Sequence, residues 1–173
     1  MAEKKFRGGA IKLIEKLFFL FVFCALPLIS NCYQRLENIS VKATDEGIVF
    51  SHPAMEDAAK QGNRCVFGEI SVSRRDAANA PQEEMWSAQN TESGFQPTAE
   101  PLKKSYIVYG ETLPQTRILV EPKPLGEGFY IVSGVVGIYN QNRELLKDLS
   151  FTNKFKLEKD AAGKLIVSNA DQK

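Results

Sequence analysis

The sequence predicts an all-β protein, an antiparallel β-sandwich of about seven to nine strands that follows an N-terminal signal helix. Short runs rich in Val, Ile, Phe and Tyr recur between turn residues such as Gly, Pro, Asn and Asp. Helical periodicity is scarce after the first 31 residues. The rest of the chain, about 140 residues, is long enough for one hydrophobic core and not obviously for two.

Residues 1–31 have the pattern of a secretory signal. Five Lys and Arg residues precede or adjoin the apolar run Leu17–Ile29, which is thirteen residues long. A helix that spans a membrane usually needs about 17–25 apolar residues, so this run is short for a span. We therefore predict a signal peptide over 1–31, with an uncleaved signal anchor as the alternative.

Cys32 is the candidate lipidation residue. A bacterial lipoprotein signal ends in an apolar residue, two small residues and the cysteine that receives the lipid, and Ile29–Cys32 fits this order except at Asn31. We expect a lipidated Cys32; in the alternative, Cys32 merely follows an anchor. Tyr33 is not the aspartate associated with retention in the inner membrane. In a Gram-negative organism we therefore expect an outer-membrane lipoprotein that faces the periplasm.

The cysteine content and the net charge narrow the possible classes of protein further. Cys24 leaves with the signal and Cys32 carries the lipid, so Cys65 is the thiol left in the mature domain. We expect Cys65 to be buried and inert; without lipidation, a Cys32–Cys65 disulfide is the alternative. Beyond residue 31 the chain has 17 Lys and Arg against 19 Asp and Glu, a net charge of −2, which disfavours nucleic acid. We expect no cofactor and no metal.

The mature chain divides into a tether over 32–38, a single β-sandwich domain over 39–170 and a tail over 171–173. A short helix is predicted over Pro53–Gln61, capped near Ser51. The predicted strands are Ile39–Ala43, Gly47–Ser51, Cys65–Ser73, Met85–Ala88, Ser105–Tyr109, Arg117–Glu121, Phe129–Tyr139, Ser150–Leu157 and Lys164–Ser168.

Alternation of apolar and polar residues assigns faces to two of these strands. In Cys65–Ser73, the face predicted to be buried holds Val66, Gly68, Ile70 and Val72. Phe129–Tyr139 is apolar on both faces, which predicts a central strand, and Gly134 and Gly137 predict a bend or a bulge in it. The predicted core includes Trp86, Phe67, Tyr130, Val132 and Ile138.

The connections follow from Gly, Pro and Asn. A terminal hairpin is predicted at 160–163 and a turn at 140–142. The polar stretches 76–84 and 90–104 are predicted to be long loops, either plain connections or a contact surface. The basic pairs Arg74-Arg75 and Lys103-Lys104 flank these loops and suit an acidic partner, although exposed strand ends commonly carry such pairs.

Two features resemble immunoglobulin-like and fibronectin type III domains. Leu125–Tyr130 resembles the corner before the sixth strand of those domains, where an apolar residue, a Gly-containing turn and a tyrosine set the sandwich corner. Trp86 resembles the core tryptophan of a middle strand. The resemblance implies an Ig-like sandwich.

A longer pattern extends from about Ile39 to Leu157. It joins a strand containing Cys65 and Phe67, then Met85–Ser87, then Tyr106–Gly110, a corner rich in Pro and Gly, and the strand Tyr130–Tyr139. This pattern resembles a group of small lipoproteins of Gram-negative bacteria described as immunity proteins of the type VI secretion system. The resemblance implies a periplasmic protein that neutralises a toxic effector delivered by sister cells.

The sequence offers no catalytic constellation. His52 is the single histidine and lacks the partners of a nucleophilic triad, while the acid pairs Asp45-Glu46 and Glu83-Glu84 fall in predicted loops. We predict a non-enzymatic protein of the cell envelope that binds a protein partner and no small-molecule substrate. The alternatives are a structural or assembly lipoprotein of an envelope machine, and a signal-anchored periplasmic domain of unknown binding role.

Lipidation of Cys32 is directly testable. Mass spectrometry of the mature protein should show an acylated N-terminal cysteine, and Cys32→Ala should disturb processing and release the chain from the membrane. An intact Met1 terminus in the mature protein would instead support a signal anchor.

Overall fold

The computed structural model describes residues 36–75, 81–91 and 98–169. The chain divides into two units, Met1–Arg35 and Leu36–Lys173, and all described residues belong to the second. The predicted signal over 1–31, the lipidation residue Cys32 and the tail 171–173 therefore lie outside the described residues.

The described residues form strands and one short helix, α2 (Pro53–Lys60). The strands are β1 (Glu37–Asn38), β2 (Ser40–Thr44), β3 (Gly47–Ser51), β4 (Arg64–Arg75), β5 (Pro81–Asn90), β6 (Tyr106–Val108), β7 (Thr116–Val120), β8 (Gly128–Tyr139), β9 (Leu145–Lys159) and β10 (Leu165–Asn169). All nine predicted strands are present; Gly47–Ser51 has the predicted bounds, and the others have shifted ends. The tether prediction is wrong over 37–38, because β1 pairs in parallel with Phe151 and Thr152 of β9.

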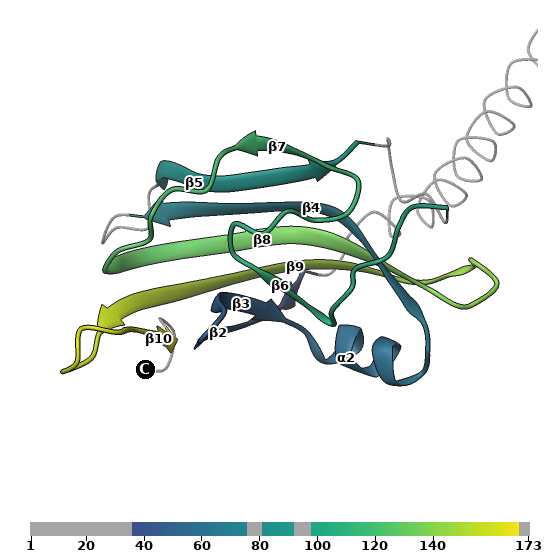
Figure 1. The fold of residues 1–173 in the computed structure, drawn as a ribbon, viewed down its shortest axis with the longest axis horizontal. Coiled ribbons are helices and arrows are strands. Elements are labelled where there is room, and N and C mark those ends of the chain that lie inside the picture. The colour runs from purple at the N-terminus through teal and green to yellow at the C-terminus, as the bar shows by residue number, and fades with distance from the viewer. Residues whose placement is uncertain (1–35, 76–80, 92–97, 170–173) are drawn as a thin grey trace, which may run out of the picture. The chain divides into compact units, whose positions relative to one another are not determined.

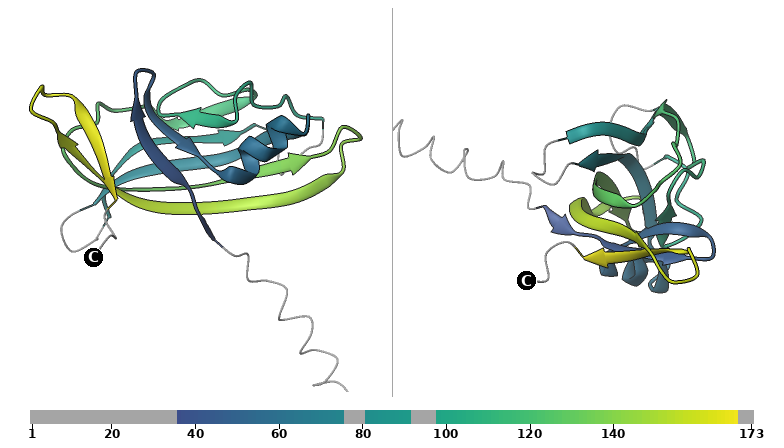
Figure 2. Two further views of the ribbon diagram at one scale, coloured as in Figure 1. Left: turned by 90° about the horizontal axis from the view of Figure 1, so that it is seen from below. Right: turned by 90° about the vertical axis from the view of Figure 1, so that its left-hand side faces the viewer.

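The strands form two sheets. The large sheet has the order β1-β9-β8-β4-β5-β7, with β10 also paired to β9, and the small sheet has the order β2-β3-β6. Figures 1 and 2 show the small sheet and α2 on one face of the large sheet. Buried side chains from both sheets belong to one hydrophobic core. The predicted all-β sandwich is therefore confirmed.

The five predicted core residues are buried, each with 4% or less of its surface exposed: Phe67, Trp86, Tyr130, Val132 and Ile138. Ring contacts join the layers. Phe155 of β9 stacks on Tyr130 with 5.5 Å between ring centroids and meets Phe50 of β3 edge-on at 6.2 Å. Trp86 meets Tyr109 edge-on at 5.3 Å. These contacts hold the small sheet, and Tyr109 just after β6, against the large sheet.

β8 is the predicted central strand, since it pairs with β4 on one side and β9 on the other. Gly134 lies opposite Phe151 in this sheet. A Cβ atom on Gly134 would lie 2.4 Å from the carbonyl oxygen of Glu69 and 2.6 Å from the Phe151 ring, so a larger residue cannot fit without movement. The register of β8 with β9 shifts between Ile138 and Tyr139, whereas Gly134 and Gly137, where a bend or bulge was predicted, pair in regular register with Phe151 and Asp148.

The predicted faces of β4 are wrong in its first half. Pairing with β8 shifts register between Phe67 and Glu69, which makes Gly68 the extra residue of a β-bulge. The bulge interrupts the alternation, so Phe67 shares the main core with Ile70. Val66 instead belongs to a second small cluster, whose other members are Ala99 and Tyr139.

One further prediction needs correction. β5 begins at Pro81, so residues 81–84, predicted as loop, lie in a strand. The cap of α2 lies near Ser51, as predicted: the N-cap is the next residue, His52, which is extended and whose Nδ1 accepts the N–H of Ala54 at 3.1 Å. An imidazole nitrogen thus supplies the acceptor that Ser or Asn usually supplies at an N-cap.

The predicted turns are confirmed. The N–H of Asn140 donates to the carbonyl oxygen of Glu144 at 3.0 Å, and the N–H of Asp160 donates to that of Lys164 at 2.9 Å. The predicted corner before β8 has its tyrosine hydrogen bond. The Tyr130 hydroxyl donates to the carbonyl oxygen of Gly126 at 2.9 Å and accepts its N–H at 3.2 Å.

Removing the Trp86 side chain should strongly destabilise the domain. Trp86→Ala is expected to cost about 3–5 kcal/mol of the free energy of unfolding, a large part of the roughly 5–15 kcal/mol typical of a domain. Trp86→Phe should cost less, since it keeps an aromatic ring beside Tyr109 and removes an indole N–H that has no partner among the described residues. Urea unfolding measures both variants. Native emission typical of a fully hydrated indole would contradict this placement of Trp86.

Candidate interaction site

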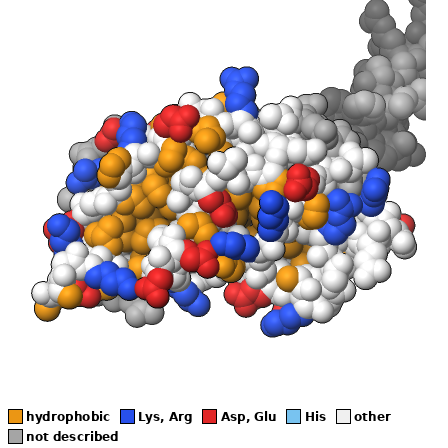
Figure 3. Space-filling view, in the orientation of Figure 1, with side chains coloured by type: hydrophobic (Ala, Val, Ile, Leu, Met, Phe, Trp, Pro, Cys, Tyr) orange, Lys and Arg blue, Asp and Glu red, His pale blue; other side chains and the backbone are white. Residues whose placement is uncertain are grey.

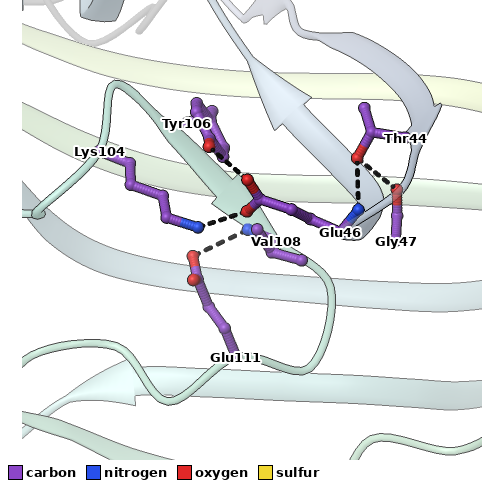
Figure 4. Close-up of polar contacts among 7 residues, drawn as sticks. All are labelled: Thr44, Glu46, Gly47, Lys104, Tyr106, Val108 and Glu111. Carbon is purple, nitrogen blue, oxygen red and sulfur yellow. Dashed lines mark hydrogen bonds and ion pairs between the residues drawn. The ribbon is translucent and has the colours of Figure 1, made fainter.

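The β2–β3 turn supplies the first part of the candidate site. Thr44 Oγ1 accepts the N–H of Glu46 at 3.2 Å and donates to the carbonyl oxygen of Gly47 at 3.2 Å. Gly47 has a φ of +118°, a backbone conformation that favours glycine. This tight turn presents the Glu46 side chain toward Tyr106 of β6 and toward Lys104, as Figure 4 shows.

Glu46, Lys104 and Tyr106 form a compact cluster, the Glu46 cluster (Figure 4). The Glu46 carboxylate forms an ion pair with the ammonium of Lys104 and accepts the Tyr106 hydroxyl at 3.1 Å. The Lys104 ammonium also lies 5.1 Å from the centroid of the Tyr106 ring, a cation–π contact. Each pair in the cluster is therefore in contact, and each side chain fixes the orientation of the other two.

The ionisation of the Glu46 cluster favours recognition over proton transfer. Hydrogen bonds from Lys104 and then Tyr106 lower the pKa of the Glu46 carboxyl below its ordinary value of 4.5. The hydrogen bond with Glu46 raises the pKa of Lys104 above 10.5. Both groups therefore stay charged at neutral pH, and a carboxylate held ionised cannot act as a general acid there. The cluster presents oriented hydrogen-bonding groups to a partner.

A pocket of about 290 Å³ adjoins the Glu46 cluster. Glu111 contributes to its wall, and the Glu111 carboxylate accepts the N–H of Val108 at 2.8 Å. The pocket is lined by acidic, basic and apolar groups: Glu100, Leu102, Lys103, Lys104, Tyr106, Glu111, Thr112, Leu113 and Pro114. A pocket of this size and mixed lining suits a long or aromatic side chain of a partner better than a large ligand.

Hydrophobic side chains gather on the same face of the domain. Figure 3 shows them over one half of this face, beside the charged pairs. In the domain as a whole, the hydrophobic residues that pack on the core but stay only partly buried are Ala43, Ala54, Leu102, Tyr109, Leu125, Leu165 and Val167. A surface that combines apolar area, an accessible tyrosine and charged groups at its border has the composition of a protein-binding site.

The contacts of His52 serve to hold the fold together. Its Nδ1 accepts the N–H of Ala54, and its Nε2 lies 3.3 Å from a Glu37 carboxylate oxygen. The other Glu37 oxygen lies 2.7 Å from Nζ of Lys147. Burial lowers the pKa of His52 below 6.5; the charges of Glu37 and Glu56 oppose this shift, and Lys147 adds to it. His52 is therefore neutral at pH 7 and links α2 to β1 and β9.

Cys65 is buried, as predicted. Its thiol lies 3.9 Å from the carbonyl oxygen of Met55, and burial raises the pKa of Cys65 to about 11. The thiolate is the nucleophilic form of cysteine, so Cys65 is unreactive at neutral pH.

The sequence alone indicated only some of the residues of the Glu46 cluster. Lys103-Lys104 was visible as a basic pair and Asp45-Glu46 as an acidic pair in a turn, but no pattern connects them. Tyr106 and Glu111 had no signal that separates them from other strand and loop residues. Lys104 and Glu46 are 58 positions apart, so the pairing of β3 with β6 is what brings them together.

Within 36–75, 81–91 and 98–169, no group of three or more His, Cys, Asp and Glu side chains could hold a metal ion. The helix within them is not long and apolar enough to cross a membrane. No protein-family model, curated protein or solved structure matches this chain.

Acidification should destabilise the domain in two steps. Protonation of His52 acts at the higher pH, and protonation of the carboxylates of the domain acts at the lower pH. Because the pKa of His52 is lower in the folded state than the ordinary 6.5, the unfolded chain binds more protons as the pH falls below 6.5. The free energy of unfolding should therefore decrease between about pH 7.5 and about pH 5.5. His52→Asn keeps a capping acceptor and should remove this decrease.

Urea unfolding at several pH values measures the effect. The pKa values of Glu46, Glu83 and Glu158 are lowered from 4.5 by hydrogen bonds from lysines, so the stability that they contribute is present above 4.5 and lost below it. The two pH windows are therefore separate. Equal pH dependence in the parent protein and in His52→Asn would contradict the assignment to His52.

Proposed function

We propose that this protein is a non-enzymatic binding module of the cell envelope that recognises a protein partner through the Glu46 cluster and its pocket. The observation that carries the proposal is the position of an oriented Glu–Lys–Tyr cluster and a pocket of about 290 Å³ on a face where hydrophobic side chains reach the surface. Tyrosine and buried apolar groups dominate the energetics of many protein interfaces, and charged groups at the border set specificity.

The placement of the reactive side chains supports a binding role. His52 caps a helix and contacts Glu37, while the Cys65 thiol is buried with a raised pKa. Glu46 is held as an ionised acceptor. The Cys65 thiol is thus kept from the thiolate form that nucleophilic catalysis needs, His52 is engaged in structural contacts, and Glu46 is kept from the protonated form that a general acid needs.

We further propose that the domain is an Ig-like variant. The order β9-β8-β4-β5 corresponds to strands G, F, C and C′ of a variable-type sandwich, and β2-β3-β6 corresponds to A, B and E. The hydrogen bond between the Tyr130 hydroxyl and Gly126 supports this assignment, because it has the geometry of a tyrosine corner at the start of strand F. Two features depart from that pattern: Trp86 lies on the C′ equivalent, and β7 follows the E equivalent and pairs with β5.

The envelope location rests on the sequence. The signal pattern over 1–31 and the candidate lipidation at Cys32 support a lipid-anchored protein that faces the periplasm, in the outer membrane of a Gram-negative cell. The resemblance to type VI secretion immunity lipoproteins supports a partner that is a toxic effector. In this proposal the domain occludes the effector by stoichiometric binding.

Coexpression with the effector encoded by a neighbouring gene tests the proposal. The chain should protect cells when it is exported, and the purified protein should form a stoichiometric complex with the effector. Lys104→Glu and Tyr106→Ala should each weaken the complex by about thirtyfold if the cluster is central to the interface. Lys154→Glu is the matched charge control, since Lys154 is exposed and its neighbour Phe155 points into the core.

Thermal unfolding is the folding control, and two outcomes would contradict the proposal. Unchanged thermal unfolding would show that Lys104→Glu and Tyr106→Ala remain folded. A tight complex that none of the three substitutions weakens would show that another surface binds the effector. Protection without export, or at amounts far below the effector, would contradict stoichiometric binding in the periplasm.

A further inference from the structure

A row of small hydroxyl side chains crosses the large sheet on the face turned away from the small sheet. Antiparallel pairing places these residues side by side on adjacent strands, in the order Thr152 of β9, Ser133 of β8, Ser71 of β4 and Ser87 of β5. Their neighbours along the strands, such as Val72 and Trp86, lie in the core, so the row faces outward. Side chains this small leave room above the sheet, and a hollow of about 230 Å³ lies over Ser133, Ser71 and Ser87.

A β-bulge in β7 gives the hollow an apolar wall. β7 pairs Val120 with Ser87 and Ile118 with Ala88, so Leu119 between them is the extra residue of the bulge. Bulges change the direction in which a side chain points, and Leu119 lines the hollow while it remains 50% exposed. The hollow therefore has an uncovered apolar surface beside its polar floor.

Two carboxylates also line the hollow, Glu69 from β4 and Glu84 from β5. Glu84 Oε1 accepts the Ser71 hydroxyl at 3.1 Å, which draws this carboxylate over the row. The Glu69 carboxylate has no hydrogen bond or ion pair among the residues that the structure describes. The ammonium of Lys123 pairs with Glu83 and reaches only the backbone carbonyl of Glu84. The hollow therefore has negative charge that the described part of the chain does not neutralise.

Ser87 is an independent sign that the hollow receives a ligand. The residue is only 5% exposed, and it lines the hollow. Its hydroxyl makes no hydrogen bond to another residue within 36–75, 81–91 and 98–169. Buried hydroxyls in native proteins nearly always have a hydrogen-bond partner, so this one is placed to receive its partner from a molecule that enters the hollow.

We propose that the hollow binds an arginine side chain of a protein partner, at a site separate from the Glu46 cluster. The carboxylates supply negative charge, and the acceptors are their oxygens, the hydroxyls and the Gln89 side-chain carbonyl. A guanidinium carries five N–H donors in a planar fork, whereas the ammonium of lysine is a compact point charge, so acceptors spread over neighbouring strands suit arginine better. The aliphatic stem of the arginine lies against Leu119 in this arrangement.

The probe is a capped Gly-Arg-Gly peptide, titrated into the isotope-labelled full-length chain in a non-ionic detergent and followed by amide chemical shifts. We expect saturable shifts at Ser71, Ser87 and Ser133, with a Kd of about 1 mM. The same peptide with citrulline, a neutral analogue of arginine, should give no saturable shift. The peptide with lysine should bind at least about threefold more weakly.

Substitutions of single carboxylates locate the binding site. Glu69→Gln and Glu84→Gln each remove one charge at nearly constant size, and each should weaken binding of the arginine peptide by about fivefold. Glu56→Gln is the matched control for net charge and should leave binding unchanged. Glu56 is exposed on α2, which lies on the other face of the large sheet. Thermal unfolding shows whether each variant is folded.

Several results would overturn this inference. The arginine peptide might give no saturable shift, or it might shift only residues away from the hollow. The citrulline or lysine peptide might bind as tightly as the arginine peptide. Binding that Glu69→Gln and Glu84→Gln weaken no more than Glu56→Gln does would also contradict it, because the carboxylates of the hollow would then not hold the guanidinium.

Discussion

The contact of Phe155 with Tyr130 and Phe50 is the interaction on which the rest of the structure depends. Phe155 and Tyr130 belong to the large sheet, and Phe50 belongs to the small sheet. A three-stranded sheet built on one hairpin of two five-residue strands has little independent stability, so β2, β3 and β6 need this apolar contact to hold their place. The small sheet in turn carries Glu46 and Tyr106. The geometry of the candidate site is therefore a consequence of core packing.

Tyr130 connects this core contact to the chain path. Its ring lies in the core with 1% exposure, while its hydroxyl binds the backbone of Gly126 at the corner before β8. The Tyr109 hydroxyl has a similar role, since it donates to the carbonyl oxygens of Met85 and Lys123. Two tyrosines thus fix the segment between β7 and β8, Tyr109 at Lys123 and Tyr130 at Gly126. Ordered connections of this kind make a surface pre-organised, which lowers the entropy that binding must offset.

Buried and exposed polar side chains have different roles in this structure. Buried or half-buried polar side chains, such as His52 and Asn153, make local structural contacts, the latter to the carbonyl oxygen of Ile39. The charged groups of the Glu46 cluster remain about half exposed, so they lose little hydration on folding and contribute little to stability. Because the fold does not depend on them, these groups are available for recognition, and substitutions there should separate binding from folding.

The sequence by itself determined the class of the domain, its strands and much of its core. Period-two alternation and turn residues are local properties, so they were sufficient to locate β3, β8 and the hairpin at 160–163. Burial of Trp86 and Tyr130 followed from residue type and strand position in the same way. The helix was located as well, with its N-cap near Ser51, at His52.

Tertiary structure decided what depends on register and on distant pairing. The bulge at Gly68 moved Val66 out of the main core, because a single inserted residue reverses which side chains face inward. β1 became a strand only through its partner β9, more than 100 positions away. Glu46, Lys104 and Tyr106 met for the same reason, through the pairing of β3 with β6. Contacts between distant segments are set by packing of the whole chain, and local periodicity contains no information about them.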